Sequence, residues 1–331
     1  MRRAMRRERV FRERENYLDK NDDRYLIERY RMSRGAIVSI VEIIKDDLLT
    51  VTNRSHAIDP QIQLLIALRY YAKGGFLSET GDLHGVSRSS VSRITKRVTD
   101  GIIHHLRGTI SFPADVLQLK EGFYAIAHIP NVVGAIDGTL IPIIAPSADE
   151  HTYVCRKGFH ALNIQAVVDS RCRFINIVAR WPGSVHDSFI LNNSNLSAVF
   201  ERREIDGWLL GDSGYPLRPW LLTPIANPTT HADDRYNRAH KKTRSVIERA
   251  FGICKSRFMC LHKSAGHLMS SPERSCRIIY ACFILHNICI ENNIPFAEEE
   301  LDEDEDEITY NGPINDGVST RRALIQSRFS N

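Results

Sequence analysis

The chain has 331 residues, of which 43% are hydrophobic and 8% aromatic, and it carries 44 Lys and Arg against 40 Asp and Glu. This composition is ordinary for a globular protein, and it excludes a collagen-like chain, a wholly disordered chain and a disulfide scaffold. The net charge of +4 is unevenly distributed along the chain. Residues 298–307 hold nine acids and no base, so the net charge of all other residues is +4 plus 9, or +13. A chain that is this basic outside its acidic run favours a polyanionic partner.

Residues 1–60 mix charged residues with an apolar, helix-like segment at Ile37–Leu49, and we expect a helical N-terminal region. Residues 1–15 are rich in both Arg and Glu and contain no apolar stretch, so they match neither a secretory signal nor a transit peptide. No run in the sequence approaches the roughly 20 apolar residues of a membrane span. We therefore expect a soluble intracellular protein without membrane contact.

Residues 61–108 predict a helix-turn-helix. In the sequence GDLHGVSRSSVSRITKRV at 81–98, Gly85 permits a tight turn, Ser87 can cap the second helix, and spaced Val and Ile residues supply its packing face. The second helix would carry outward cations that can reach the DNA major groove: Arg88, Arg93, Lys96 and Arg97. A helical hairpin with a solvated basic face and a dimerisation element are the alternatives.

Residues 109–131 predict a connecting helix, which Asp115 caps and Pro130 ends. Short runs rich in Val and Ile then predict strands at 132–144, 163–170, 172–181 and 208–210. The second and third of these would form a hairpin that turns near Asp169. Helical patterns follow at 183–200, 243–258 and 273–291. This order indicates an α/β domain over 132–292, with helices packed against a mixed sheet.

Four acids occur in settings that suit a metal site. Asp137 interrupts an apolar run typical of a strand buried on both faces, where an unpaired carboxylate is costly; an Asp-Gly hairpin turn is the alternative. Asp187 begins a helical stretch and Asp212 follows a short strand, although either can be an ordinary helix-start or turn acid. Glu248 lies beside the apolar stripe of its helix near Arg244, and a surface ion pair between these two is the alternative.

The last predicted apolar helix contains three cysteines that we interpret as buried thiols: Cys276, Cys282 and Cys289. A zinc site of Cys282, His286 and Cys289 is the alternative, but it lacks a complete tetrahedral shell. We expect His286 and Asn287 to form hydrogen bonds within a helical layer. Residues 293–331 predict an acidic, disordered tail, which could also compete with DNA for the basic body.

These motifs, in this order, resemble the Harbinger transposase-derived nucleases and the PIF/Harbinger DDE transposases behind them. The resemblance runs from the helix-turn-helix to LHN at 285–287, and includes FPAD at 112–115, YVCRKGFHALN at 153–163, WPGSVHDS at 181–188, WLLGDSGY at 208–215, RYNRAHKKTRSVIERAFG at 235–252 and SRFMCL at 256–261. It implies an RNase-H-like catalytic core that uses a DDE triad of Asp137, Asp212 and Glu248. It also implies that Asp187 is a further acid at the metal site.

Such a set of acids suits phosphodiester cleavage. Two divalent ions about 3.5 to 4 Å apart can activate a nucleophile and stabilise the leaving oxygen, and Mg²⁺ or Mn²⁺ accepts carboxylate ligands. We expect Asp137 and Asp212 to be direct ligands, Glu248 to complete the second ion's shell and Asp187 to be an outer or alternate ligand. A basic turn adds cations that either contact DNA phosphate or stay solvated: Arg156, Lys157 and His160.

The leading interpretation is a nuclear, transposase-derived nuclease, with the cytoplasm as a second location, that hydrolyses DNA phosphodiesters with a divalent metal. The resemblance further implies a separate Myb/SANT-like DNA-binding partner protein, and a homo-oligomer is an open alternative to a monomer. One alternative function is a domesticated, catalytically silent DNA-binding or adaptor protein. Another is a hydrolase of small phosphate esters, which the basic helix-turn-helix disfavours.

Overall fold

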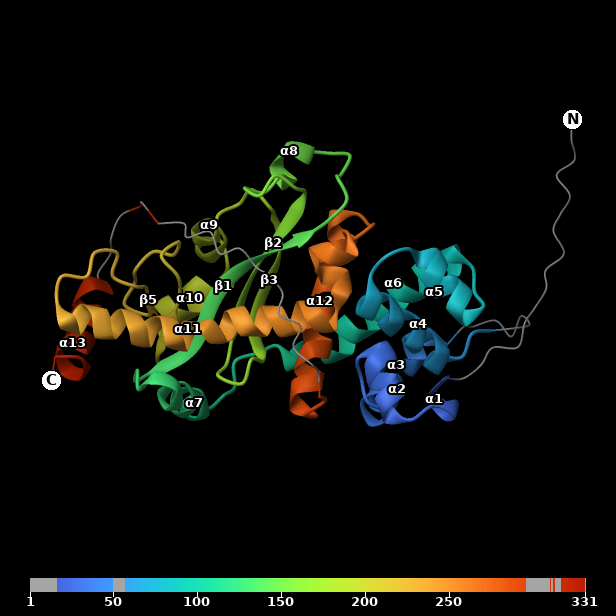
Figure 1. Cartoon of the computed structure of the whole chain (residues 1–331), viewed down its shortest axis with the longest axis horizontal. Coiled ribbons are helices and arrows are strands. Elements are labelled where there is room, and N and C mark those ends of the chain that lie inside the picture. Colours follow the sequence, from blue (N-terminus) through green and yellow to red (C-terminus); the bar gives the residue numbers. More distant parts are fainter. Residues whose placement is uncertain (1–16, 50–56, 296–309, 311, 313–316, 331) are drawn as a thin grey trace, which may run out of the picture.

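The computed structural model describes residues 17–49, 57–295, 310, 312 and 317–330. A bundle of N-terminal helices lies at one end of an elongated molecule, and a sheet with its covering helices forms the remainder (Figure 1). The acidic run at 298–307 and residues 1–15 lie outside the described residues. Among those that are described, no helix is both long and apolar enough to cross a membrane.

The bundle is built from capped helices around a shared apolar core. They are α1 (Tyr17–Lys20), α2 (Asp23–Tyr30), α3 (Arg34–Leu48), α4 (Pro60–Lys73), α5 (Leu77–His84) and α6 (Arg88–Leu106). Ser33 caps α3 by accepting a hydrogen bond from the Ala36 N–H, and Asp59 caps α4 through the Gln61 N–H. The side chains of α4 are buried almost all round, because α3, α5 and α6 surround it.

The segment predicted as a helix-turn-helix folds as α5 and α6, joined by a short turn. Gly85 has a left-handed φ of 62°, which glycine adopts without strain, and Ser87 Oγ accepts a hydrogen bond from the Ser90 N–H at 3.2 Å. A Cβ on Gly81 would stand 2.6 Å from the Val86 carbonyl oxygen, so α5 meets the turn closely. The predicted turn chemistry is therefore present, while DNA binding by α6 stays a prediction.

Five strands form one sheet in the order β3-β2-β1-β4-β5. They are β1 (Val132–Pro142), β2 (Ala161–Val168), β3 (Phe174–Pro182), β4 (Trp208–Leu210) and β5 (Leu221–Leu222). The first three are antiparallel neighbours, whereas β4 and β5 run parallel to β1. β1 continues through Asp137 and Gly138, so the hairpin-turn alternative for this dipeptide is wrong. The predicted β2–β3 hairpin turns at Asp169, whose N–H donates to the Arg173 carbonyl at 2.9 Å.

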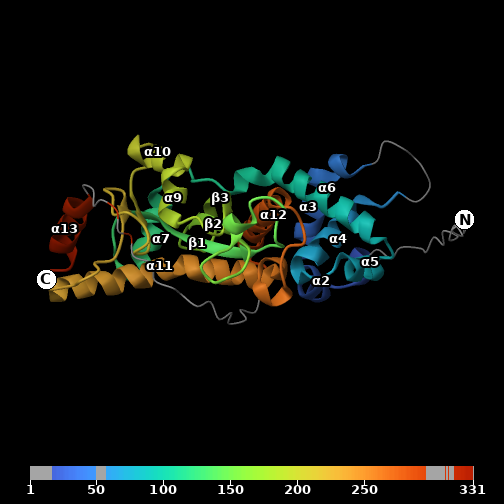
Figure 2. The ribbon, with the colours of Figure 1, turned by 90° about the horizontal axis from the view of Figure 1, so that it is seen from above.

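Helices cover both faces of this mixed sheet, consistent with the predicted RNase-H-like core. Figure 2 shows α9 (Asp187–Asn192) and α10 (Asn195–Glu201) on one side and α11 (His231–Arg257) on the other. Successive residues of β1 pack into two different hydrophobic cores on opposite faces of the sheet. Ala135 belongs to the core that also includes residues of α11 and α12 (Pro272–Glu291). Ile136 belongs to the core that includes residues of α9 and α10. α7 (Leu117–Ala127) packs against β1 and α11. Its N-cap is Val116 rather than the predicted Asp115, which instead accepts a hydrogen bond from the Leu117 N–H at 2.8 Å.

Two of the predicted helices differ in extent from the sequence-based expectation. α11 begins at His231 rather than at residue 243, because Thr230 and Asp233 form a reciprocal capping box. The helix expected over 183–200 is divided into α9 and α10. Short elements complete the chain: η1 (Arg107–Thr109), α8 (Glu150–Tyr153), η2 (Met259–Leu261) and η3 (Lys263–Ala265).

Part of the predicted disordered tail is ordered. Residues 317–328 form α13 (Gly317–Arg328), which contacts α11 and β5. Its Leu324 and Ile325 are buried, and Arg321 donates to the carbonyl oxygens of Thr223 and Pro224 at 3.1 and 3.0 Å. Disorder is therefore the wrong expectation for this part of residues 293–331. Leu324 and Ile325 are buried against elements that are distant in sequence, and this packing exists only in the folded chain.

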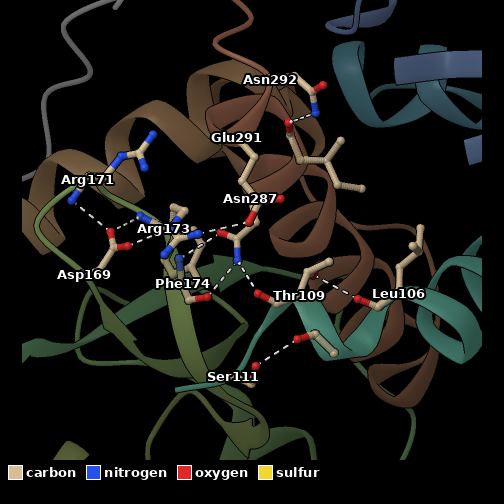
Figure 3. A network of polar contacts seen from close by, with 12 residues as sticks. Leu106, Thr109, Ser111, Asp169, Arg171, Arg173, Phe174, Asn287, Glu291 and Asn292 are labelled. Carbon is tan, nitrogen blue, oxygen red and sulfur yellow. Dashed lines mark hydrogen bonds and ion pairs between the residues drawn. The ribbon is translucent and has the colours of Figure 1, made fainter. Parts of the chain in front are cut away.

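Helix α12 connects the bundle to the sheet. Asn287 accepts a hydrogen bond from the Phe174 N–H at 2.8 Å and donates to the carbonyls of Phe174 and Thr109 at 2.7 and 3.0 Å (Figure 3). His286 Nε2 lies 2.8 Å from the Cys172 carbonyl oxygen. His286 and Asn287 therefore form structural hydrogen bonds, as expected, but these join α12 to β3, the β2–β3 turn and η1 rather than lying within a helical layer. At the other end of α12, Arg274 donates to the Ser92 carbonyl of α6 at 2.6 Å.

The cysteines are free thiols. Cys282 and Cys289 are fully buried, as expected of core residues, and Cys276 is partly exposed. Burial raises the pKa of the Cys289 thiol to about 11, which keeps it protonated at neutral pH.

Candidate active site

The four predicted metal-ligating acids come from four different elements. Asp137 lies in the middle of β1, and Asp212 follows the parallel neighbour β4 by two residues. Asp187 is the first residue of α9, and Glu248 lies on α11. Because β1 and β4 are adjacent, the sheet brings Asp137 and Asp212 together although 212 − 137 = 75 positions separate them.

Arg244 links two of these acids. Its Nη1 donates to Asp137 Oδ2 at 2.8 Å, and its Nη2 pairs with Glu248 Oε1 one helical turn away. The Arg244, Asp137 and Glu248 side chains are 13%, 17% and 30% exposed. The ion pair that was the alternative explanation for Glu248 is therefore present, but it is partly buried and shared with Asp137.

Asp187 reaches β1 from the α9 side, next to Asp137. A Cβ on Gly138 would stand 2.2 Å from Asp187 Oδ1, so the glycine leaves the space that the carboxylate fills. Asn163 on β2 donates through Nδ2 to Asp187 Oδ1 at 2.9 Å and to the Val185 carbonyl at 2.8 Å. Our sequence reasoning assigned no role to Gly138 or Asn163, although the Asp-Gly dipeptide and the HALN motif contain them.

The turn after β4 presents Asp212 beside a buried tyrosine. Asp212 Oδ1 accepts a hydrogen bond from the Gly214 N–H at 3.0 Å, which fixes the turn. Tyr215 is 1% exposed, and its hydroxyl donates to Gln165 Oε1 at 3.3 Å. Burial raises the pKa of Tyr215 well above its ordinary value, and the charges of Asp187, Asp137 and Asp212 raise it further. One phenol thus lies within the field of three carboxylates.

Like charges are crowded in this site. Burial raises the pKa of Asp137 well above its ordinary value, and the Asp212 charge adds to this shift while the Arg244 guanidinium opposes it. Burial also raises the pKa of Asp187 to about 6, although the hydrogen bond from Asn163 lowers it. Asp137, Asp187 and Asp212, which we call the acid cluster, therefore share one electrostatic environment, and Glu248 is connected to it through Arg244.

The acid cluster has the chemistry, but not yet the arrangement, of a metal site. In the part of the chain that the structure describes, no group of three or more His, Cys, Asp or Glu is gathered closely enough to hold an ion. Carboxylate oxygens are nevertheless the ligands that Mg²⁺ and Mn²⁺ prefer. Two buried atoms beside the cluster, Asn163 Oδ1 and Gln165 Nε2, have no hydrogen-bond partner among the described residues. A hydrated cation fits these residues, because it would neutralise the carboxylates and its water could satisfy such atoms.

The predicted DNA-contacting residues of α6 differ in exposure. Arg88, Arg93 and Lys96 are exposed, and Lys96 pairs with Asp100 at 2.8 Å. Arg97 instead donates to the Asp47 and Leu49 carbonyls at the C-terminal end of α3, at 2.8 and 3.2 Å. This contact holds the Arg97 guanidinium against the bundle and reduces its reach toward a ligand.

The basic turn before β2 lies near the acid cluster. Arg156 and Lys157 are exposed, and the charge of Arg156 lowers the pKa of Asp187. His160 Nε2 lies 2.9 Å from Glu150 Oε1, so this imidazole already has an acidic partner. Among the predicted residues of this turn, Arg156 thus has an electrostatic interaction with the candidate active site.

Comparisons with known proteins agree on a family. A family model described as DDE superfamily endonuclease matches residues 136–287. The chain is 43% identical over 281 residues to the human protein named "Putative nuclease HARBI1", covering 84% of this chain and 80% of that protein. It is 41% identical to the mouse protein of the same name, over 95% of this chain and 93% of the mouse protein. It is also 31% identical to "Protein ALP1-like" of Arabidopsis thaliana, over 79% of this chain and 70% of that protein. No solved structure gives a significant match.

Proposed function

The chain belongs to the DDE superfamily endonucleases, together with the Harbinger transposase-derived HARBI1 proteins, and on this premise we propose that it hydrolyses DNA phosphodiester bonds with a divalent metal. The observation that carries the proposal is the acid cluster, in which Asp137 and Asp187 have raised pKa values. Carboxylates crowded in this way repel one another in the metal-free protein, and a bound cation would relieve the repulsion.

The proposal gives each acid a role that its position supports. Asp137 and Asp212, on adjacent strands, are direct ligands, and Asn163 positions Asp187 as a further ligand. Glu248 joins when the Arg244 guanidinium releases it, and Arg244 can then donate to a phosphate oxygen of the DNA. A divalent cation bound here supplies the activation of a water molecule and the stabilisation of the leaving oxygen.

DNA is the proposed substrate because exposed cations occur both beside the acid cluster and on α6 of the helical bundle. Arg156 lies close enough to influence Asp187, and α6 presents Arg88, Arg93 and Lys96 at the surface. Phosphate contacts of this kind make affinity fall steeply with salt concentration. Nuclear location and a Myb/SANT-like DNA-binding partner belong to the proposal as well, and they rest on the family resemblance alone.

A plasmid-nicking assay tests the proposal. The parent protein should nick supercoiled DNA with Mg²⁺ or Mn²⁺ and stop when a chelator is added. Asp137→Asn should reduce the rate on the order of a thousandfold, as the loss of one member of a catalytic unit does. Asp206→Asn is the matched control, because Asp206 is 93% exposed and pairs with Lys120 at 2.6 Å away from the cluster. Equal nicking by parent and Asp137→Asn protein would refute the assigned site.

A second candidate function is a catalytically silent DNA-binding or adaptor protein. The observation that favours it is the position of Arg244, which already neutralises Asp137 and Glu248 without a metal. The same assay separates the two candidates. A parent protein that retains DNA at low salt, but nicks it with neither cation, is the adaptor.

A further inference from the structure

An exposed aromatic ring lies beside the acid cluster. Phe189 is 49% exposed, whereas Ile190 and Leu191 of the same helix are fully buried. Its ring meets the Trp181 ring edge-on, with centroids 5.2 Å apart and planes at 87°. Trp181 therefore supports Phe189 from the side of the sheet and leaves part of the phenyl ring facing solvent. A single exposed Phe is not by itself a binding site, so its surroundings decide what it does.

The sheet ties this aromatic pair to Asp187. Trp181 on β3 pairs with Asn163 on β2, next to an irregularity in the register of these two strands. Asn163 in turn donates to Asp187 at 2.9 Å. Phe189 also follows Asp187 by two residues in α9. Both connections place the exposed ring within a short distance of the carboxylate that we assign to the active site.

Arginine flanks the pair. The Arg180 guanidinium carbon lies 5.3 Å from the centre of the Trp181 ring, and Nη2 donates to the Asn193 carbonyl at the end of α9 at 2.8 Å. Arg180 is exposed, and Arg156 adds a second exposed cation near Asp187. A supported aromatic face next to exposed arginines is the composition of sites that stack nucleic-acid bases and bind the adjoining phosphates.

We propose that Phe189, Trp181 and Arg180, called the aromatic platform, bind an unpaired DNA base next to the phosphodiester at the acid cluster. The base stacks on Phe189, Trp181 holds that ring in place, and Arg180 pairs with the neighbouring phosphate. This inference rests on the proposed nuclease function and adds a substrate feature to it. Because an unpaired base need not be removed from a duplex, the platform favours DNA whose strands are open near the cleavage site.

Binding measured without cleavage tests the platform. A short single-stranded DNA that carries the fluorescent base analogue aminopurine is titrated with the full chain in the presence of a chelator. Stacking on Phe189 should quench the analogue. Phe189→Ala should weaken binding roughly 5- to 150-fold and abolish the quenching, the range expected for the loss of one stacked base. Phe189→Trp should restore both, whereas Phe189→Leu, which keeps an apolar side chain without a π face, should not.

Tyr124→Ala provides the matched control, because Tyr124 is a 40% exposed aromatic residue on α7 and should leave binding and quenching unchanged. Parental affinity and quenching by the Phe189→Leu variant would overturn the platform. Parental binding and quenching by Phe189→Ala, shown to be folded by its thermal melt, would overturn it as well. Plasmid nicking is scored separately: quenching without nicking overturns the nuclease and keeps the platform, and nicking without quenching does the reverse.

Discussion

Asp169 and Asp187 are two aspartates of the same sheet-containing region, but their surroundings differ in kind. Asp169 accepts hydrogen bonds from the backbone N–H groups of Arg171 and Arg173, both at 2.9 Å, and from the Arg173 guanidinium at 2.7 Å (Figure 3). Asp187 accepts a hydrogen bond from Asn163 and lies in the field of other carboxylates. The first carboxylate is matched by donors, whereas the second is crowded by like charges.

The difference separates a structural site from the candidate active site. Asp169, Arg173 and Asn287 form what we call the junction network, in which donors meet acceptors and the protein itself provides the stabilisation. The acid cluster keeps a repulsion among its carboxylates, which Arg244 offsets in part and which a bound cation would relieve. Natural proteins tolerate such local conflict where a site must bind something. Changes in the two regions should therefore alter stability in opposite directions.

The largest effect is expected for Asn287→Ala. This change removes the partner of the Phe174 N–H and of the Phe174 and Thr109 carbonyls, all at the contact between α12, β3 and η1. Unfolding in urea should show a loss of about 3 to 5 kcal/mol, since buried groups without partners are costly. Asn292→Ala is the control, because Asn292 donates only locally, to Ile288 of its own helix, and its loss should cost less than about 0.5 kcal/mol. Similar losses in both variants would contradict the role of the junction network.

A somewhat smaller loss is expected for Asp169→Asn. The amide keeps one acceptor oxygen but turns an NH₂ group toward the donors of Arg173, whose side chain is 28% exposed. We expect a decrease of about 2 to 4 kcal/mol in the free energy of unfolding, measured at pH 8 in urea. A neutral result would mean that water replaces these contacts readily.

The same chemical change at position 187 should have the opposite sign. With a chelator at pH 8, Asp187→Asn should raise the free energy of unfolding by about 1 to 2 kcal/mol, because the folded parent protein holds a carboxylate whose pKa is about 6 against an ordinary 3.8. A raised pKa stabilises the folded parent below about pH 4, and this stabilisation is lost as pH rises through about 6. The advantage of the variant should therefore disappear on acidification.

Comparison with the parent at each pH isolates this effect. The buried side chains of His84, His240 and His286, whose pKa values are lowered to about 4, destabilise both proteins equally in acid. If Asp187→Asn is less stable than the parent at pH 8, the charged Asp187 carboxylate is stabilised by its hydrogen-bond donors rather than destabilised by burial and neighbouring charges.

The smallest effect is expected for metal addition. Mg²⁺ at about five times its dissociation constant should stabilise the parent protein by about 1 kcal/mol, since a ligand that binds the folded state shifts unfolding by mass action. A thermal melt with and without Mg²⁺ measures this. Asp137→Asn should lose the response and Asp169→Asn should keep it, because only the first belongs to the acid cluster. An equal response in both would place the cation elsewhere.

Local signals in the sequence determined much of the fold. Gly85 and Ser87 specify the α5–α6 turn, Asp115 precedes α7, and the apolar runs around Asp137 and before Asp212 correspond to β1 and β4. The motifs also indicated the family and the candidate acids. These features act through contacts a few residues apart, so they can be recognised in the sequence.

Only the tertiary structure decided how the acids meet. Arg244 contacts Asp137 across 107 positions, Gly138 makes room for Asp187, and Asn163 on another strand positions it. Likewise, α13 is ordered because Leu324 and Ile325 are buried against distant elements. Such contacts depend on strand order and on which side chains occupy the same space, and neither is encoded within a short stretch of residues. The sequence therefore determined which groups are the candidate catalytic residues, and the packing of the sheet against α9 and α11 decided which of them lie in one electrostatic environment.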